Sequence, residues 1–425
     1  MSVEFDGLMA AVDPFEQNPI LAVALSGGPD SMALTLLLQD WAARRNGRVI
    51  GLTVDHGLRP SSAEEAHQAG CWLRSLGIEH HILTWSGPKP RTGVQQRARD
   101  ARYDHLSNWC RKAGVLHLLT AHHRQDQAET VALRIVKGSG PDGLAAMSAI
   151  RDLPRLRLIR PLLRIDKERL IATLEDAGQP WIDDPSNKSR SFARNRLRLD
   201  GIDVPALSER AADHSRRRNS SDKRISILLA RLVTIDPMGF ARISAGHFGD
   251  LSSEVSARLL ARVLTTIGGA PYPPRRDSLE RLVGRMRDER PFRGTTLAHC
   301  QIRQRRGQWL LCRENDRRPA LELTPQHWHC WEDRFLIRLR GRLRPVFVHR
   351  LGDQAWSKRK DLVQHGQKRD IPAVIRESLP AIWQDGALIA IPHLGLFERT
   401  LAPTVLDLKF RPRTPLANAP FAAHM

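Results

Sequence analysis

The chain has 425 residues, enough for roughly two to four domains of ordinary size. It carries 66 Lys and Arg against 46 Asp and Glu, a formal net charge of +20 that favours a polyanionic partner such as a nucleic acid. Five cysteines without a CxxC pair argue against a disulfide framework or a cysteine-ligated metal centre. No apolar run approaches the ~20 residues that span a bilayer, and the acidic first residues are unlike a signal peptide. We therefore expect a soluble, cytoplasmic protein.

Strand-like and helix-like segments alternate over about the first 180 residues. Four apolar runs predict strands, at residues 21–25, 49–54, 81–85 and 116–120. Four segments with apolar residues at helical spacing predict helices, at residues 32–44, 61–76, 94–113 and 125–136. The alternation is typical of βαβ units, so the predicted fold class is α/β, a Rossmann-like parallel sheet with helices on both faces. Because ligands of such sheets lie at the carboxyl ends of the strands, the turns after Leu25, Val54 and Thr120 are the places to search for a site.

The second half of the chain does not continue the alternation of strands and helices. Residues 201–235 predict a long basic linker helix, and residues 236–315 a small α+β unit with two helices and a hairpin near Cys300–Cys312. The stretch from Asp316 to Pro325, rich in charge, predicts a linker, and residues 326–425 predict a β-rich terminal unit. With residues 1–200 as the first domain, the sequence predicts four parts.

The turn after the first predicted strand reads Ser26-Gly27-Gly28-Pro29-Asp30-Ser31. Glycines let backbone N–H groups approach phosphate oxygens, and the helix that follows adds the positive end of its dipole. Neither the P-loop pattern GxxxxGK nor the dinucleotide pattern GxGxxG occurs here. The turn instead resembles the pyrophosphatase loop (PP-loop) of enzymes that cleave ATP between the α- and β-phosphates, in which Asp30 would hold Mg²⁺. The alternative is a tight glycine turn in which Asp30 or Ser31 merely caps the helix.

The second predicted strand ends in Val54-Asp55-His56. In a Rossmann-like sheet this end lies beside the first turn, so we predict that Val54 and His56 lie against the adenosine of ATP. Asp55 alone is equally well explained as a turn former at the strand end.

The fourth predicted strand leads to His122 and His123 and then to a helix that carries Asp126 and Glu129 on one face. The spacing HHxxD lacks the HExxH geometry of a zinc site, and acids at a helix start can also be simple partners of the dipole. Because this segment and the first turn converge on the same sheet edge, we favour a functional role for the two acids.

Residues 181–198 are dense in Asp, Asn and Arg and offer little to bury. Arg194, Asn195 and Arg196 have the chemistry to bind phosphate or to polarise a nucleobase carbonyl. A solvated basic helix start is an equally good interpretation of these three residues taken alone.

Six segments then occur in an order that resembles a known family. They are SGGPDS, VDHGLRPSSAEEA, QQRARDARY, AHHRQDQAETVALRIVKGSGPDGL, RPLL and WIDDPSN with a later RNR. Over about residues 20–200 they are similar, with high specificity, to the tRNA(Ile)-lysidine synthetase family, whose layout the basic helix and terminal units match loosely. The chain departs in having Ala121 where members often have Thr, and Lys188-Ser189 where an acidic residue is common. The second departure leaves the role of the 186–196 loop open.

The resemblance implies a ligase that uses ATP and Mg²⁺. ATP would adenylate the C2 oxygen of the wobble cytidine in a CAU-anticodon tRNA(Ile), and free L-lysine would then displace AMP, changing decoding from AUG to AUA. The implied catalytic residues are Asp30, which would also hold the metal, Asp126 and Arg194. The implied ATP-binding residues are Ser26, Gly27, Gly28, Pro29, Asp30, Ser31, Val54 and His56. Asp126 and Glu129 would receive lysine, without a choice between them, and the residues expected to face tRNA are Arg97, Arg196, Arg216, Arg217 and Arg218.

Three other functions fit parts of the pattern. A PP-loop enzyme acting on a small molecule, such as an NAD or GMP synthetase, is disfavoured by the net charge and the long basic second half. A tRNA thiolase would need paired cysteines or a cysteine-ligated cluster, whereas Cys71 and Cys110 fall inside predicted helices. A non-catalytic RNA-binding protein is disfavoured by the joint presence of Asp30, Asp126 and Glu129. We expect both terminal units to bind tRNA and expect no membrane partner. The sequence leaves the oligomeric state open, with a homodimer as one option.

Overall fold

The computed structural model describes residues 1–57, 62–85, 94–153, 156–183, 196–197, 200–288, 290–316, 319–341, 345–365, 371–417 and 421–422. The chain forms two compact units, one of Met1–Asp222 with Asn418–Met425 and one of Lys223–Ala417. Among the described residues, no helix is both long and apolar enough to cross a membrane. The predicted division into four parts remains a prediction.

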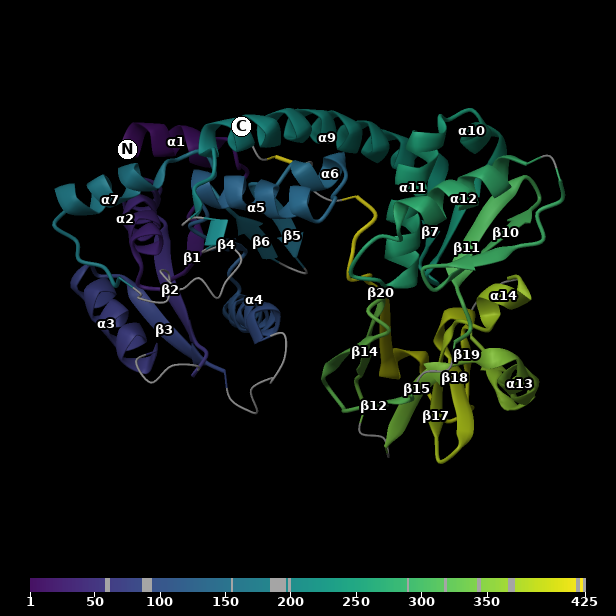
Figure 1. Cartoon of the computed structure of the whole chain (residues 1–425). Coiled ribbons are helices and arrows are strands. Elements are labelled where there is room, and N and C mark those ends of the chain that lie inside the picture. Colours follow the sequence, from purple (N-terminus) through teal and green to yellow (C-terminus); the bar gives the residue numbers. More distant parts are fainter. Residues whose placement is uncertain are drawn as a thin grey trace. The chain divides into compact units, whose positions relative to one another are not determined.

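The first unit is built on a six-stranded sheet (Figure 1). Its strands are β1 (Ile20–Ala24), β2 (Arg48–Asp55), β3 (Glu79–Thr84), β4 (His117–Leu119), β5 (Ile150–Leu153) and β6 (Leu156–Ile159). They lie in the order β3-β2-β1-β4-β6-β5, and each neighbouring pair is parallel except β5 with β6. The predicted α/β class with a Rossmann-like parallel sheet is confirmed. The sequence did not predict β5 and β6, which extend the sheet beyond β4.

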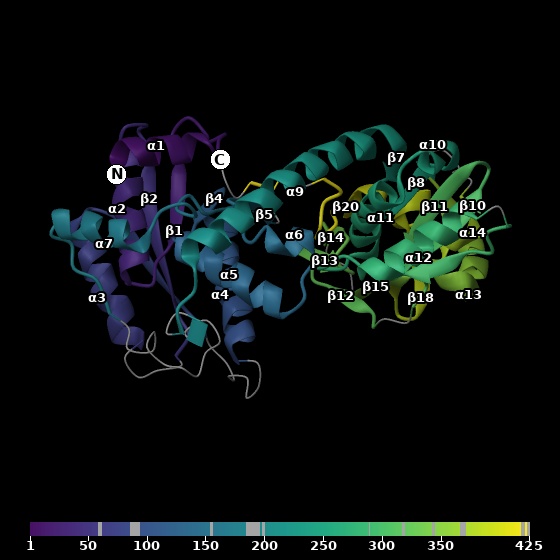
Figure 2. The ribbon, with the colours of Figure 1, turned by 45° about the horizontal axis from the view of Figure 1, so that its top comes forward.

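Helices cover both faces of this sheet (Figure 2). They are α1 (Ser2–Ala10), α2 (Pro29–Ala43), α3 (Ser62–Ser75), α4 (Val94–Ala113), α5 (Arg124–Val136), α6 (Pro141–Leu144) and α7 (Lys167–Asp176). Leu21 and Val23 of β1 join the core beneath α1, α2, α3 and α7, whereas Ala22 joins the core beneath α4. A strand buried on both sides must be apolar throughout, which is why β1 reads as a continuous apolar run rather than an alternating one.

A single long helix, α9 (Val204–Leu232), joins the two units. Near its start, Ala211 packs with Val131 and Leu144 of the first unit. Near its end, Ile225 and Leu229 belong to the apolar core of the second unit. The two halves of the helix are therefore each held by a different core.

The second unit begins with a five-stranded antiparallel sheet in the order β7-β8-β11-β10-β9. Its strands are β7 (Val233–Asp236), β8 (Phe240–Ser244), β9 (Thr295–Leu297), β10 (Cys300–Arg305) and β11 (Gln308–Arg313). The helices are α10 (Ala245–Gly249), α11 (Ser253–Gly268) and α12 (Arg276–Arg287). The two predicted helices and the predicted hairpin are all present here.

Two further antiparallel sheets complete this unit. The larger contains β12 (Leu321–Leu323), β15 (Val346–Arg350), β16 (Val363–Gln364), β17 (Pro380–Gln384), β18 (Ala387–Ile391) and β19 (Leu396–Phe397). The smaller contains β13 (Trp328–Trp331), β14 (Phe335–Leu339) and β20 (Leu406–Phe410), and two short helices, α13 (Gly352–Ser357) and α14 (Ala373–Arg376), accompany them.

The linker predicted for residues 316–325 is wrong in part, because β12 lies inside it and pairs with β15. Leu323 is buried in the core between the two sheets. The strand has only three residues, two of them leucines, so its composition does not distinguish it from a charged loop.

A buried cluster of charges connects the sheets of the second unit. Glu332, in the turn between β13 and β14, accepts hydrogen bonds from Arg334 (2.9 Å) and Arg350 (2.5 Å), and Arg313 at the end of β11 lies 4.0 Å away. Arg334 also donates to the carbonyl of Gly239, between β7 and β8. Burial by itself favours the neutral acid, but the hydrogen bond from Arg350 and the charge of Arg334 hold the pKa of Glu332 below its ordinary value. An ionised carboxylate therefore gathers three buried guanidinium groups.

Candidate active site

The turn between β1 and α2 is held in shape by its two serines. Ser31 Oγ accepts a hydrogen bond from the Ser26 N–H (3.2 Å) and donates one to the Gly28 carbonyl (3.0 Å). The two hydroxyl oxygens lie 3.2 Å apart. Because Ser31 has only one hydroxyl proton and gives it to Gly28, Ser26 is the donor between the two hydroxyls. The turn is thus closed by its own side chains before any ligand arrives.

Gly27 and Gly28 have different backbone requirements in this turn. Gly27 has φ of +79°, and a Cβ built there would lie 2.5 Å from Ile182 Cδ1. Its carbonyl accepts a hydrogen bond from the Ile182 N–H (2.9 Å). Gly28, the N-cap of α2, has φ of −73°, and its Cβ would meet Ser26 Oγ at 3.5 Å and the Ile182 carbonyl oxygen at 3.9 Å, both ordinary contacts. Pro29 follows as the first helical residue, so the turn leads directly into a helix N-terminus, where backbone N–H groups are unpaired.

Asp30 and Asp126 meet on either side of a buried histidine. His123 Nε2 lies 3.6 Å from Asp30 Oδ2 and 3.5 Å from Asp126 Oδ2, and its side chain is 2 % exposed. Burial by itself lowers the pKa of His123, but the hydrogen bond with Asp30 and the charges of both aspartates raise it above its ordinary value. The two carboxylates therefore favour protonation of the imidazole, and His123 orients a carboxylate from α2 and one from α5 toward the same place.

Asp126 also fixes the start of α5. Its Oδ2 accepts the backbone N–H of His123 (3.0 Å), so this side chain caps the first turn of the helix. Glu129 is fully buried on the same helix. On another side of α5, the Gln127 amide pairs with both backbone groups of Met147 (2.8 and 3.0 Å). The helix is therefore anchored at its first turn, next to both acids.

The structure offers one clear position for a cation at this site. Asp30 Oδ1 is buried and has no hydrogen-bond partner among the described residues. A carboxylate oxygen left in this way is a ligand that Mg²⁺ prefers, and Asp126 Oδ2 shares His123 with it. Asp30 therefore fits the role of a ligand of a magnesium ion.

Three residues at the end of β2 were considered from the sequence, and the structure gives the contacts of two of them. His56 accepts a hydrogen bond from Arg102 Nε of α4 (3.3 Å) and packs edge-on against Trp85, at 5.9 Å between ring centroids. Asp55 accepts hydrogen bonds from the Gly57 N–H (2.9 Å) and Ser62 Oγ (2.7 Å), as a turn former does. Val54 is half-buried at the carboxyl end of the strand, and its place beside a nucleotide remains a prediction.

The arginines predicted to face RNA fall in different surroundings. Arg97 and Arg196 are exposed, and Arg194 lies outside the described residues. Arg216 and Arg217 are exposed on α9, and Arg216 pairs with Asp213 one turn earlier.

Arg218 has a different role from its two neighbours on α9. It is half-buried, donates to the carbonyl of Asp142 (2.7 Å) and lies 4.1 Å over the ring of Phe421. Its contacts therefore hold α9 and the segment at Phe421 on the first unit, and the run of three arginines is not one uniform surface.

Two residues at the sheet edge received no role from the sequence. His123 was one of a pair of histidines, and only the fold shows that it contacts both aspartates. Arg160 follows β6, is 5 % exposed, and donates to the Ser148 carbonyl (2.8 Å). Burial lowers the pKa of Arg160, although Tyr103 opposes the shift. The signal available for Arg160 was an arginine directly after an apolar run, in RPLL.

Comparison with known proteins places the chain among PP-loop enzymes. Residues 4–203 match the PP-loop domain family. The tRNA(Ile)-lysidine synthase of Bradyrhizobium sp. strain BTAi1 is 40 % identical over 273 residues, covering 60 % of this chain and 76 % of that protein. The tRNA(Ile)-lysidine synthase of Ruegeria pomeroyi is 34 % identical over 388 residues, covering 88 % and 89 %. The structure is also similar to the U34-tRNA thiolase NcsA from Methanococcus maripaludis, at 17 % identity and a TM-score of 0.43, covering 51 % of this chain and 78 % of that one.

The two glycines of the turn make a matched pair of substitutions. We expect Gly27→Ala to lower the free energy of unfolding by about 1–3 kcal/mol, because the positive φ and the contact with Ile182 both oppose a Cβ. Gly28→Ala should cost less than about 1 kcal/mol, since only its N-cap position suffers, but should weaken ATP binding if its backbone meets the phosphates as predicted. Urea unfolding and nucleotide titration measure the two effects. An equal loss of stability in both variants would contradict this account of the turn.

Proposed function

The chain belongs to the tRNA(Ile)-lysidine synthase family of PP-loop ligases, and we propose that it joins free L-lysine to C2 of the wobble cytidine of a CAU-anticodon tRNA(Ile), using ATP. The observation that carries the proposal is the meeting of Asp30, His123 and Asp126 at the carboxyl ends of β1 and β4. The turn after β1 and the acids of α5 thus lie side by side, which supports a reaction that uses both ATP and an amine.

In the first half-reaction, the C2 oxygen of the cytidine attacks the α-phosphorus of ATP. A bond forms between that oxygen and phosphorus, the bond from the α-phosphorus to the bridging oxygen breaks, and pyrophosphate leaves. The N–H groups at the start of α2, which the serine bonds hold in position, bind the phosphate oxygens. Asp30 would hold Mg²⁺, which would offset the negative charge of the phosphates. His123 keeps both carboxylates oriented.

In the second half-reaction, the lysine amine attacks C2 of the adenylated base and AMP leaves. The bond between C2 and the amine nitrogen replaces the bond between C2 and oxygen, and the amine must lose protons to react. Asp126 and Glu129, both buried, attract the ammonium and one of them accepts a proton from it. The low exposure of these acids strengthens their attraction for a cation, because water screens it little.

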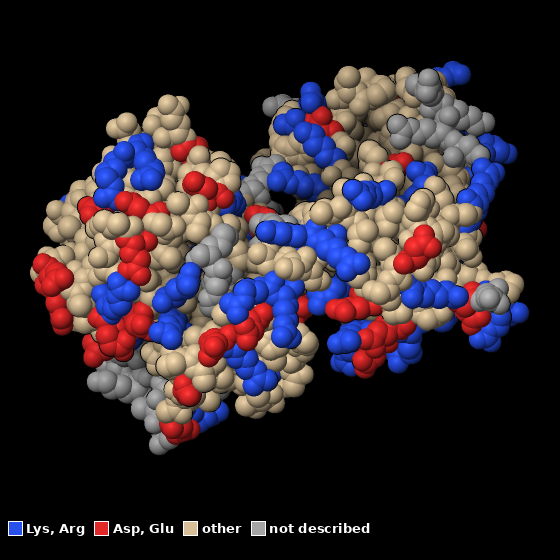
Figure 3. Space-filling model, turned by 90° about the horizontal axis from the view of Figure 1, so that it is seen from above, with Lys and Arg blue, Asp and Glu red and all other residues tan. Residues whose placement is uncertain are grey.

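The substrate RNA is held by the basic surface of the chain. Arg97 and Arg196 are exposed on the first unit, and Arg216 and Arg217 on α9. Figure 3 looks onto the face that includes α9 and shows numerous Lys and Arg side chains there, interrupted by acidic ones. A net charge of +20 displaces condensed counterions from RNA phosphates, so binding is sensitive to salt.

Release of pyrophosphate tests the proposal when lysine and tRNA are omitted in turn. We expect sustained release only with both present, limited release with tRNA alone, and none without tRNA. Asp30→Asn should lower release about 100-fold or more, because the charge that supports the transition state is lost. Asp40→Asn, an exposed position on the same helix, serves as the control and should leave release unchanged. Release without tRNA would instead indicate a ligase for small molecules.

Asp126→Asn separates the use of lysine from the use of ATP. The amide oxygen of Asn can still accept the His123 N–H, so the cap of α5 survives while the charge is removed. We expect about a tenfold higher KM for lysine and little change in the limited pyrophosphate release with tRNA alone. Glu129→Gln is the parallel variant that distinguishes the two acids. An unchanged lysine KM and kcat in both variants would move the lysine site elsewhere.

Arg216→Ala combined with Arg217→Ala should weaken tRNA binding and leave ATP binding alone. The slope of log affinity against log salt should become shallower by about 0.7–0.9 for each phosphate that the variant no longer neutralises. Arg218→Ala is the matched control, because its contacts with Asp142 and Phe421 predict a loss of stability rather than of RNA affinity. Filter binding over a salt series measures both. An unchanged affinity and slope in the double variant would detach this part of α9 from the RNA.

A further inference from the structure

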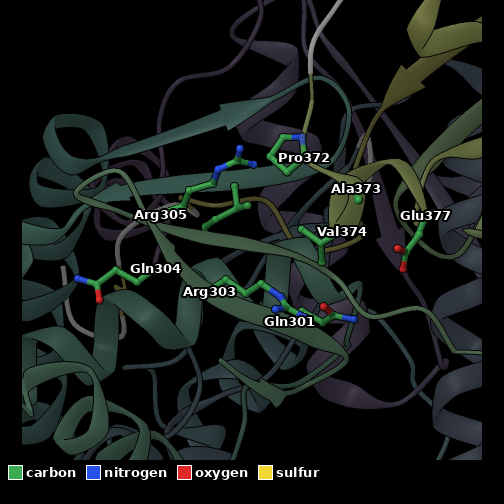
Figure 4. A pocket seen from close by; sticks show the side chains of 9 residues that line it. Gln301, Arg303, Gln304, Arg305, Pro372, Ala373, Val374 and Glu377 are labelled. Carbon is green, nitrogen blue, oxygen red and sulfur yellow. The ribbon is translucent and has the colours of Figure 1, made fainter. Parts of the chain in front are cut away.

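The second unit contains a pocket of about 380 Å³ between β10 and the segment that includes α14 (Figure 4). Gln301, Arg303 and Arg305 of β10 line one side, and Val374 and Glu377 line the other. This volume falls in the range of small-ligand sites. The pocket lies outside the PP-loop unit, so the proposed reaction leaves it without a role.

Alternation along β10 creates this pocket. Cys300 and Ile302 point into the core beneath α11 and α12, so Gln301, Arg303 and Arg305 face the opposite side of the sheet. On that side, Ile375 of α14 packs with residues of the neighbouring strand β11 but leaves the two arginines exposed.

Arg303 and Arg305 form no ion pair and no side-chain hydrogen bond with any described residue, unlike many arginines of this chain. Gln301 Oε1 is buried and has no hydrogen-bond partner among the described residues. Figure 4 shows the Arg303 side chain extending toward Gln301, with Glu377 on the other side of the pocket. Leaving a buried amide oxygen unbonded is costly, and a ligand that donates a hydrogen bond removes that cost.

These groups together describe the chemistry of a ligand. Two guanidinium groups suit a phosphate, and an amide with a carboxylate suits the mixed donors and acceptors at the edge of a nucleobase. Leu310 and Val374 supply an apolar surface against which a flat ring can pack. The presence of Glu377 argues against a ligand that is only anionic, such as an acidic peptide.

We propose that this pocket holds one unpaired nucleotide of the RNA substrate, with its phosphate on Arg303 and Arg305 and its base edge on Gln301 and Glu377. The inference rests on the proposed function, because the RNA concerned is the tRNA. RNA-binding proteins read single-stranded positions in this way, since a base in a helix does not offer its edge.

An independent feature beside the pocket supports an RNA backbone on this surface. Trp356 of α13 lies between two guanidinium groups, with Arg359 at 4.1 Å and Arg376 of α14 at 4.4 Å from its ring. Arg376 directly precedes Glu377 in the chain. These contacts gather two further cations beside the pocket, which suits the phosphates of an RNA strand.

The test uses the full chain with a labelled single-stranded RNA hexanucleotide and a blunt RNA duplex. We expect Arg303→Ala with Arg305→Ala to weaken binding of the single strand about tenfold and to change duplex binding much less. Gln301→Leu retains both cations and should reduce the differences in affinity among homopolymers. Arg276→Ala, an exposed arginine on α12 outside the pocket, is the control, and the loss of affinity is compared per arginine removed. Thermal unfolding of each variant establishes that the fold is retained.

Two outcomes would overturn the inference. Equal single-strand affinity for the double variant and the Arg276→Ala control would show that the pocket holds no nucleotide of an RNA. The second outcome is that GMP or UMP competes with the RNA for the unsubstituted protein but not for the double variant. If the double variant also binds RNA as tightly as the unsubstituted protein does, the pocket holds a free nucleotide instead. Pyrophosphate release by the unsubstituted protein is measured separately, so failure of the pocket and failure of the proposed reaction are distinguishable.

Discussion

The parallel pairing of β1 with β4 is the contact on which the candidate site depends. Leu21 pairs with His117 and Val23 with Leu119, which sets the turn after β1 beside the start of α5. The strands hold this register because β1 is buried on both faces, so any slip would expose apolar side chains. His123 then completes the arrangement by contacting an aspartate from each segment. Hydrophobic burial places the two segments, and electrostatics sets the final orientation of their acids.

The second unit is organised by a different force. Its sheets meet around Glu332, whose carboxylate is surrounded by Arg313, Arg334 and Arg350. Removing one partner from such a buried group leaves an uncompensated charge, which costs about 3–5 kcal/mol. The cluster therefore favours one arrangement of the sheets over others in which these charges would lack partners. An apolar contact has less directional preference and would hold the same sheets less specifically.

The charge of the chain is not uniformly available to RNA. Arg218 packs on Phe421 and binds the Asp142 carbonyl, and Arg313 and Arg334 are 1 % exposed. By contrast, Arg303 and Arg305 are exposed beside a pocket. A guanidinium group can serve inside the fold or on an RNA-binding surface, because its planar fork can bind several carbonyl or carboxylate oxygens as well as a phosphate. The net charge of +20 therefore indicates a polyanionic partner, but it does not say which arginines meet it.

The sequence by itself determined β1 to β4 and α2 to α5 of the first unit and the nature of its main turn. Continuous apolar runs and helical spacing are local properties, and Ser26–Ser31 carries its own turn chemistry, so the α/β class followed without coordinates. Asp126 and Glu129 were also found from the sequence, because helical spacing places both on one face. The role of His123 was not, since a histidine at a helix start gives no sign of the distant aspartate it contacts. The strand at Leu321–Leu323, the burial of Arg218 and the pocket beside α14 were likewise decided only by tertiary structure. Each depends on contacts between segments far apart in the chain, and local residue patterns do not encode which segments meet.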